Sequence, residues 1–362
     1  MHMADALISP AVGGTMWAVS AGLIGHCSKK VKNEMDDQKI PLMGVMGAFI
    51  FAAQMINFTI PVTGSSGHLG GGMILSILLG PHIAFLTMAS VLTVQALFFA
   101  DGGLLALGCN IFNLGFFPCF IAYPLIYKRI AGKNPTRKNI LTGALIAAIA
   151  GLQMGAFAVV METVLSGVSE LPFRTFLLLM QPIHLAIGTV EGLTTAAVVF
   201  FIWRARPEIL NAAASSAPIG GISIRSVLTG IAVATLITGG TLSWFASSNP
   251  DGLEWAMFKT AGVEELETSH NLHLSLSEVQ KKTAFLPDYG FQSDGSELLL
   301  NEKENSAEYG GTAATTEAKK HEASSWPAID SGTSVSGLIG GLLTLTLAVA
   351  IGFILRYKKS NV

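Results

Sequence analysis

Charged residues are scarce in this chain of 362 residues. Asp, Glu, Lys and Arg together make up 13% of it, hydrophobic residues make up 51%, and the mean hydropathy is +0.54. A soluble domain of ordinary composition carries about twice that share of charge, so this class is excluded. Apolar stretches of about 20 residues, long enough to cross a bilayer, recur instead. The sequence therefore predicts an all-α polytopic membrane protein.

Several common motifs are absent. The chain has no GxxxxGK[ST] phosphate loop, which excludes ATP hydrolysis through a P-loop, and no HExxH zinc-protease motif. Its three cysteines, Cys27, Cys109 and Cys119, match neither a disulfide framework nor a CxxC metal site, so we interpret them as packing residues. The first 30 residues lack a basic n-region and an Ala-x-Ala cleavage site. We therefore expect a free Met1 at the mature N-terminus, retained because His2 is bulky.

The apolar stretches divide the chain into two predicted units. Residues 1–206 are expected to form a seven-helix bundle, and residues 222–362 a two-helix hairpin whose helices are separated by an extracytoplasmic segment, residues 248–331. A cytoplasmic linker, residues 207–221, joins the two units. The predicted crossings, of which the third is short, are residues 9–27, 41–60, 69–81, 82–100, 110–127, 139–165, 176–203, 223–246 and 334–355.

The Lys and Arg residues set the expected orientation. They gather in four clusters, at residues 29–39, 128–138, 204–206 and 356–359. All four clusters fall on one side of the membrane if residues 69–100 cross it twice, with a break at Gly80-Pro81. By the positive-inside rule this side is the cytoplasm. The N-terminus and the loop that carries His68 are then expected at the outer face, and the C-terminus in the cytoplasm.

The predicted outer segment is acidic. Residues 251–330 contain 15 Asp or Glu against 6 Lys, whereas the rest of the chain contains 9 acidic and 16 basic residues. This charge is opposite to that of a nucleic-acid-binding arm, so no nucleic acid partner is expected, and it attracts cations by long-range electrostatics. Within the segment we expect a turn and a short amphipathic helix at residues 249–255, a mobile stretch at 290–325, and solvated side chains at His270 and His273.

The N-terminus offers a set of nitrogen ligands for a metal ion. A free α-amine on Met1, the amide nitrogen of His2 and the Nδ1 atom of its imidazole can close two chelate rings around one divalent ion. A histidine at position two leaves one planar corner for a distant group, and His68 lies at the same predicted face, in the glycine-rich loop 64–72. Square-planar nitrogen ligation favours Ni(II) or Cu(II) over Zn, Mg and Ca. Met1, His2 and His68 therefore form a predicted metal site.

Other polar residues in or beside the predicted crossings have two interpretations each. Asn57 and His184 are candidates to orient the metal-bound imidazoles from behind, and an interhelical hydrogen bond explains Asn57 equally well. His184 and Glu191 share one helix face, and Glu191 serves either transport or helix packing. Ser66, in a Gly-Ser-Ser-Gly string, suggests the nucleophile of an intramembrane protease, which would need His184 as its base. Such strings are common, so this alternative is the weakest.

Separate stretches of the chain resemble one known family. Residues 1–10, 67–71, 100–108 and 110–113 resemble the substrate-capture subunit of energy-coupling-factor nickel and cobalt importers, the CbiM or NikM type, and the resemblance covers about residues 1–205. The PDGLE element, residues 250–254, is similar to a companion found fused to or encoded beside such subunits. One departure is Met3-Ala4, where an aliphatic residue and proline are frequent in the family.

The resemblance implies a function and partners. It implies that the Met1 amine, the His2 amide and imidazole and the His68 imidazole hold the transported ion, and that no resident cofactor is present. It also implies a separate transmembrane coupling subunit and cytoplasmic ATPase subunits, in agreement with the missing phosphate loop. We therefore expect a transport component, not an enzyme, that captures Ni(II) at the outer face for ATP-driven import. Cobalt import by the same mechanism and an ion-gradient-driven secondary transporter stay open as alternatives.

Overall fold

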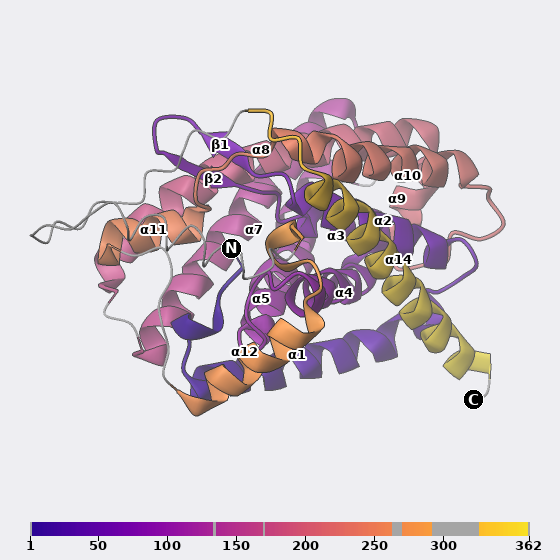
Figure 1. The fold of residues 1–362 in the computed structure, drawn as a ribbon. Helices are drawn as coiled ribbons and strands as arrows, with labels where there is room; N and C mark the ends of the chain where they lie inside the picture. Colours follow the sequence, from indigo (N-terminus) through magenta and orange to yellow (C-terminus); the bar gives the residue numbers. More distant parts are fainter. Residues whose placement is uncertain (1, 133–134, 169–170, 263–269, 292–325, 361–362) are drawn as a thin grey trace, which may run out of the picture.

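The chain folds into a mostly helical membrane protein. The computed structural model describes residues 2–132, 135–168, 171–262, 270–291 and 326–360 (Figure 1). Among these residues, five helices are long and apolar enough to cross a membrane, which confirms the class predicted from composition. They are α4 (Pro81–Phe98), the continuous helix Leu107–Ala131, α7 (Arg137–Ser166), α8 (Phe173–Ala205) and α14 (Ser331–Ser360).

Three further helices correspond to predicted crossings but fall below that length or hydropathy. They are α1 (Pro10–Lys30), α2 (Lys39–Gln54) and α10 (Arg225–Gly240). Helix α1 begins where the sequence provides a start signal. The Ser9 side chain accepts a hydrogen bond from the Val12 amide at 3.4 Å, and Pro10 occupies the first helical position.

The predicted helical crossing at residues 69–81 is wrong. Helix α3 (Gly72–Leu79) has 8 residues, so it is about 12 Å long and cannot span a hydrocarbon core of about 30 Å. The crossing predicted at residues 41–60 is also too long, because α2 ends at Gln54 and strand β1 (Phe58–Ile60) pairs in antiparallel register with β2 (Ser65–Gly67). The glycines that follow β2 explain the short helix, since Gly71 has a φ of +79°.

Helices α3 and α4 meet at the predicted break. Gly80 has a φ of +83°, and Pro81 starts α4. All residues of α3 are buried, and its last turn packs against α9 (Pro207–Ala214), a helix within the predicted linker. The continuous helix comprises α5 (Leu107–Ile111), the π-helix η3 (Phe112–Tyr127) and α6 (Lys128–Ala131).

The helices of the second unit pack on the first. Helix α2 lies against both α10 and α14. A Cβ atom at Gly44 would lie 2.5 Å from Val349 Cγ2, and one at Gly340 would overlap the Phe51 ring. Gly340, in the last predicted crossing, therefore packs on the first unit. The remaining elements are η1 (Asp5–Leu7), η2 (Val31–Asn33), η4 (Leu242–Phe245), α11 (Gly252–Ala261), α12 (Asn271–Thr283) and η5 (Pro287–Tyr289).

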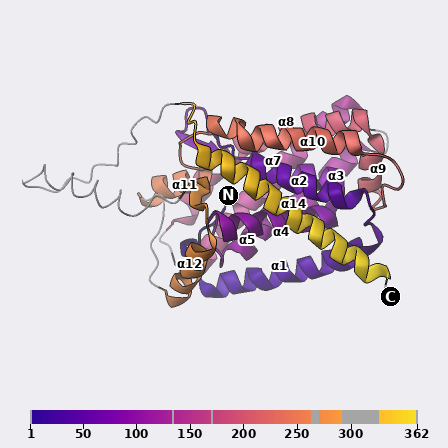
Figure 2. The same ribbon diagram turned by 45° about the vertical axis from the view of Figure 1, so that its right-hand side comes forward.

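The molecule has two distinct ends. Figures 1 and 2 show the N-terminus, the β1–β2 hairpin, α11 and α12 at one end, and α9 and the C-terminus at the other. At the second end the Arg356 guanidinium pairs with Asp37. Met1 and most of the stretch 290–325, which we expected to be mobile, lie outside the described residues.

Candidate metal centre

Helix α5 and the loop before it hold the N-terminal segment in place. The Met3 amide donates a hydrogen bond to Asn110 Oδ1 at 2.8 Å, and Asn110 Nδ2 donates to the Met3 carbonyl at 3.2 Å. The Gly103 amide donates to the same carbonyl at 2.9 Å. A Cβ atom at Gly103 would overlap Asp5, so a glycine is required for this close approach. These contacts fix the position of His2, which precedes them in the chain.

The loop that carries His68 is held from two sides. Glu191 Oε2 accepts a hydrogen bond from the Gly70 amide at 2.8 Å, and Gln54 Nε2 donates to the Gly70 carbonyl at 2.9 Å. Gln95 Nε2 in turn donates to Gln54 Oε1 at 2.9 Å. All three side chains are buried. Of the two interpretations of Glu191, helix packing now has a specific contact, because its carboxylate joins α8 to the loop.

His2 and His68 meet although they come from distant parts of the chain. Their rings stack with centroids 4.9 Å apart and an interplanar angle of 21°. His68 Nδ1 lies 3.1 Å from the Leu69 carbonyl, and because a carbonyl can only accept, Nδ1 carries the hydrogen and Nε2 keeps its lone pair. Burial and the neighbouring His2 lower the pKa of His68 to about 3. His68 is therefore neutral at physiological pH, as a metal ligand must be.

Asp101 lies on the other side of the His2 ring. His2 Nδ1 is 2.8 Å from Asp101 Oδ1, while His2 Nε2 is buried and has no hydrogen-bond partner among the described residues. The Tyr289 hydroxyl donates to Asp101 Oδ2. Burial by itself would raise the pKa of Asp101, but the charge of His2 and the hydrogen bonds from His2 and Tyr289 hold it well below its usual range. An anionic carboxylate thus lies directly beside the histidine pair.

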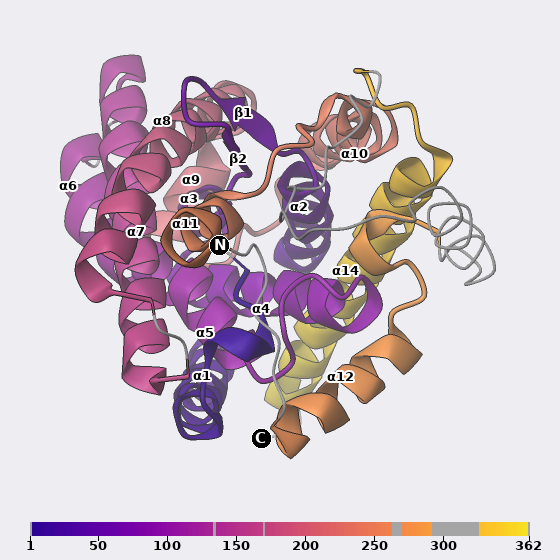
Figure 3. The ribbon, with the colours of Figure 1, turned by 60° about the vertical axis from the view of Figure 1, so that its left-hand side comes forward.

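A cavity of about 530 Å³ opens in front of the two histidines. Figure 3 shows the N-terminus beside α11, and the first and second units both contribute to the cavity wall. His273 is 3% exposed and belongs to this wall, so the expectation that it is solvated is wrong. The wall residues of the second unit are Asp251, Leu253, Glu254, Met257, His273, Ser277, Gln280, Asp288 and Tyr289.

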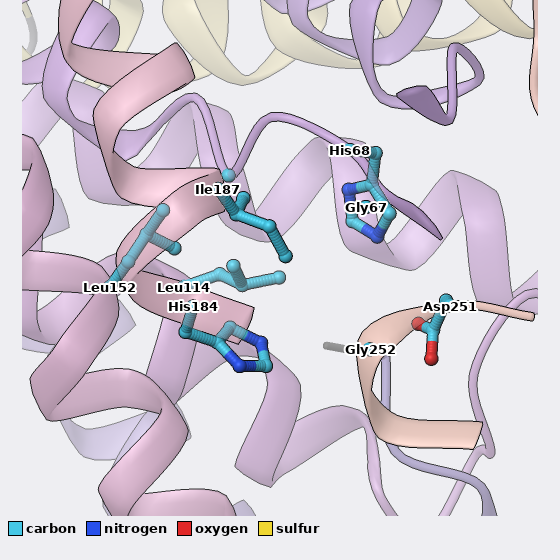
Figure 4. Close-up of a pocket in the computed structure, with 9 residues that line it drawn as sticks. Gly67, His68, Leu114, Leu152, His184, Ile187, Asp251 and Gly252 are labelled. Carbon is cyan, nitrogen blue, oxygen red and sulfur yellow. The ribbon is translucent and has the colours of Figure 1, made fainter. Parts of the chain in front are cut away.

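Asn57 and His184 lie near the histidine pair. Asn57 shares the large cavity with His2 and His68, and its Oδ1 atom is buried without a hydrogen-bond partner in the described part of the chain. His184 is fully buried on α8, where its Nδ1 atom lies 2.8 Å from the Met180 carbonyl. It lines a smaller cavity together with His68 and Asp251 (Figure 4). The orienting roles of Asn57 and His184 stay predictions.

The Ser66 hydroxyl bonds to the main chain and not to His184. It donates to the Asn249 carbonyl at 2.8 Å and lies 3.2 Å from the Pro250 carbonyl. The Ser66–His184 arrangement of a protease is therefore not formed. Furthermore, across the ranges that the structure describes, no group of three or more His, Cys, Asp or Glu side chains is arranged to hold an ion. The predicted chelate does not need such a group, because two of its nitrogens belong to the main chain of Met1 and His2.

Sequence reasoning missed the groups that support the histidines. Gln54 and Gln95 lie within predicted crossings, where a polar side chain is costly unless it is paired. Their polar character within apolar stretches was therefore a signal that these two side chains are paired. Asp101 directly follows an apolar stretch, yet nothing in the sequence indicated that it would meet His2. Tyr289 gave no signal at all.

A helical membrane protein that joins its N-terminal histidine to a loop histidine fits a component of metal transport. Residues 2–209 match the family model CbiM, described as the cobalt uptake substrate-specific transmembrane region, and residues 225–357 match the PDGLE domain. The chain belongs to the CbiM family, fused to a PDGLE domain, and it is a transport component and not an enzyme.

Relatives of known name agree with this assignment. A protein of Archaeoglobus fulgidus, named provisionally as the fused nickel transport protein NikMN, is 35% identical over 65% of this chain and 76% of its own length. The cobalt transport protein CbiM of Geobacter sulfurreducens is 27% identical over 73% of this chain and 75% of its own length. A crystal structure of a transition metal transporter superposes with a TM-score of 0.51 at 29% identity, covering 57% of this chain and 93% of that one.

Proposed function

We propose that the chain captures a divalent transition-metal ion, Ni(II) in preference to Co(II), at the outer face of the cell membrane for ATP-driven import by an energy-coupling-factor complex. The proposed ligands are the Met1 amine, the His2 amide and imidazole, and the His68 imidazole. One observation carries the proposal: the rings of His2 and His68 stack 4.9 Å apart. The nickel and cobalt transport named for the relatives supports the choice of cargo.

Planar nitrogen ligation explains the preference for nickel. Four nitrogens in one plane suit Ni(II), whereas Co(II) has no equally strong demand for this geometry. To chelate through Nδ1, the His2 ring must turn about its Cβ–Cγ bond and leave Asp101, which it contacts in the ion-free structure. The carboxylate then remains next to the cationic complex and balances part of its charge. In this proposal Asn57 and His184 orient the ligands from behind.

The proposed orientation places the metal site outside the cell. Lys128 donates to the Ala214 carbonyl of α9, Asp37 within the cluster at residues 29–39 pairs with Arg356, and Arg206 directly precedes α9. These basic residues therefore belong to the end of the molecule that also holds α9 and the C-terminus, which supports a cytoplasmic assignment for that end. We assign residues 1–206 to the metal-capture unit, in which the loop of His68 and the short helix α3 take the place of the third predicted crossing. We assign residues 207–221 to the cytoplasmic linker and residues 222–362 to a two-span companion.

The proposed partners are a transmembrane coupling subunit and cytoplasmic ATPase subunits. Helix α3 supports this arrangement, because it connects the loop of His68 with the cytoplasmic end. A Cβ atom at Gly80, which ends α3, would lie 3.1 Å from the Ala213 carbonyl of α9. A movement of α9 by the partner subunits would therefore be passed through the buried α3 to the metal loop, and the ion would be released inward.

The test is metal binding to the purified chain. Calorimetry and absorption spectra are recorded for the native protein, for a form with one extra residue before Met1, and for His68→Ala. Both changes are expected to abolish tight Ni(II) binding and its planar absorption band. His26→Ala is the matched control, because His26 is exposed at the opposite end of the molecule, next to His82. Unchanged Ni(II) affinity in the extended form would refute the site.

Two alternatives are tested with the same protein. The description of the family model favours cobalt, and direct competition between Ni(II) and Co(II) decides the cargo. A secondary transporter driven by an ion gradient predicts uptake by vesicles that contain this chain alone. The proposed mechanism predicts uptake that requires the coupling and ATPase subunits and ATP.

A further inference from the structure

We infer that the PDGLE motif, residues 250–254, is a plug that covers the His68 side of the metal site and places the Asp251 carboxylate beside the bound ion. This inference rests on the proposed function, since it assigns a role at the same site. The structure provides a contact for each of the five residues of the motif.

The first contact is made by the main chain. The Ser66 amide donates to the Pro250 carbonyl at 2.8 Å, and the Ser66 hydroxyl donates to the carbonyl of Asn249. Just before the motif, the Ser247 amide donates to the Asn57 carbonyl at 2.7 Å. The segment that leads into the motif is therefore attached to the β1–β2 hairpin, at Ser66, which lies two residues before His68.

The motif then starts a rigid helix. Asp251 Oδ1 accepts hydrogen bonds from the amides of Leu253 at 2.7 Å and Glu254 at 2.9 Å, and Glu254 Oε2 accepts from the Asp251 amide at 2.9 Å. This reciprocal capping box satisfies the free amides at the start of α11. Leu253 is 3% exposed and anchors the first turn in the protein interior. The capping box fixes the position of the Asp251 side chain.

Gly252 allows the helix to begin against α8. A Cβ atom at this position would lie 2.6 Å from Ile183 Cγ2 and 3.5 Å from His184 Cε1. Real Cβ atoms do not approach other atoms as closely as the first of these distances, so any larger residue would lift the plug away from α8. The glycine of the motif thus sets how deeply the plug sits.

The space under the plug is small and lies beside His68. The cavity there has a volume of about 10 Å³, about the size of one water molecule. Figure 4 shows His68, His184 and Asp251 around this space, with Gly252 between the two last residues. The Nε2 atom of His184 is fully buried there and has no hydrogen-bond partner among the described residues. A divalent ion next to His68 would be attracted by the Asp251 carboxylate, and burial strengthens this attraction.

Asp251→Asn and a distant control form a matched pair of variants. Asp251→Asn removes the charge near the ion but keeps an oxygen that caps α11, because Asn and Asp are equivalent N-caps. Glu278→Gln removes a charge of the same sign from an exposed position on α12 that lines neither cavity. We expect Asp251→Asn to weaken Ni(II) binding at least about tenfold. The affinity of Glu278→Gln stays within about twofold of the native value, and the ion-free melting temperature is unchanged in both variants.

Closure by the plug is tested through the rate of ion release. Gly252→Ala lifts the plug, so Ni(II) dissociation, followed with a chelator in excess, is expected to accelerate about tenfold or more. Gly240→Ala is the control, because a Cβ atom at Gly240 meets nothing within 4 Å. Native affinity in Asp251→Asn together with a native release rate in Gly252→Ala would overturn the inference.

The His68→Ala variant separates the two levels of the argument. If His68→Ala loses Ni(II) binding while Asp251→Asn and Gly252→Ala behave as native, the plug inference fails and the proposed function stands. If His68→Ala binds Ni(II) with native affinity, the proposed site itself is wrong.

Discussion

Replacement of Asn110 by alanine tests how the N-terminal segment is positioned. Asn110 pairs with both the amide and the carbonyl of Met3 inside the protein, and the carbonyl keeps a second bond from Gly103 in the variant. Asn110→Ala leaves the Met3 amide without its partner and removes one of the two hydrogen bonds to the Met3 carbonyl, which together cost about 2 to 3 kcal/mol. Because these bonds hold His2 beside His68, Asn110→Ala is expected to lower the Ni(II) affinity about 30- to 150-fold.

The assay is calorimetric titration of Ni(II) into the detergent-solubilised chain, with thermal unfolding of the ion-free protein in parallel. Ser20→Ala is the control variant. It removes one buried hydrogen bond, from the Ser20 hydroxyl on α1 to the Gly108 carbonyl at 2.7 Å. Gly108 lies on α5, the helix that also carries Asn110, and the bond lies away from the N-terminal segment. Asn110→Ala with an affinity equal to that of Ser20→Ala would refute the reasoning, since both variants would then act through general stability.

Further predictions concern pH, the loop of His68 and the packing of the second unit. Ni(II) affinity should fall as the pH is lowered from 8 to 5, because binding removes protons from the amide of His2 and from the Met1 amine, whose typical pKa is about 7.7 to 8.0. A Ni(II) affinity that does not change with pH in this range would exclude the chelate. The pKa of His68 is lowered from 6.5 to about 3 in the folded protein. Between these two pH values the unfolded chain carries a proton on His68 and the folded protein does not, so the ion-free protein should lose stability as the pH falls below about 6.5. The variant His68→Gln should reduce this loss. Glu191→Leu leaves the buried Gly70 amide without its acceptor. It should lower the free energy of unfolding by about 1 to 3 kcal/mol and weaken Ni(II) binding. Thr189→Val, on the exposed side of the same helix, should have little effect in the same unfolding and binding assays. Gly340→Ala should lower the melting temperature through overlap with Phe51, at a cost of about 1 to 3 kcal/mol, and an equal effect of Gly240→Ala would contradict this account.

Long apolar stretches predicted the long helices well. The crossings expected at residues 139–165 and 176–203 correspond to α7 and α8, which extend a few residues further at each end. Hydropathy failed in the region of residues 55–72, where it cannot distinguish a helix from two strands of three residues followed by a glycine-rich turn. There, hydrogen bonds to Gln54 and Glu191, made by residues far away in the sequence, decide the conformation.

The contact between His2 and His68 followed from chelate chemistry and from the predicted topology, both of which depend on local sequence. The hydrogen bonds around that contact could not be predicted in the same way. Asp101 meets Tyr289, and Asn110 meets Met3, because segments far apart in the sequence pack together with a particular register and rotation. Hydropathy and charge do not encode that register. The groups that surround the histidine pair could therefore be identified only from the structure.

The second unit forms part of the wall in front of the histidines, and it does so within one polypeptide. Covalent linkage gives two interacting parts an effective concentration in the millimolar range when the connection is short. At that effective concentration even weak contacts, such as the hydrogen bonds of Ser66 with residues 249–250, are formed in most molecules. Two separate proteins at cellular concentrations would need an interface of much higher affinity to remain associated. In the fused chain, assembly of this wall is independent of gene dosage and of competition from other membrane proteins.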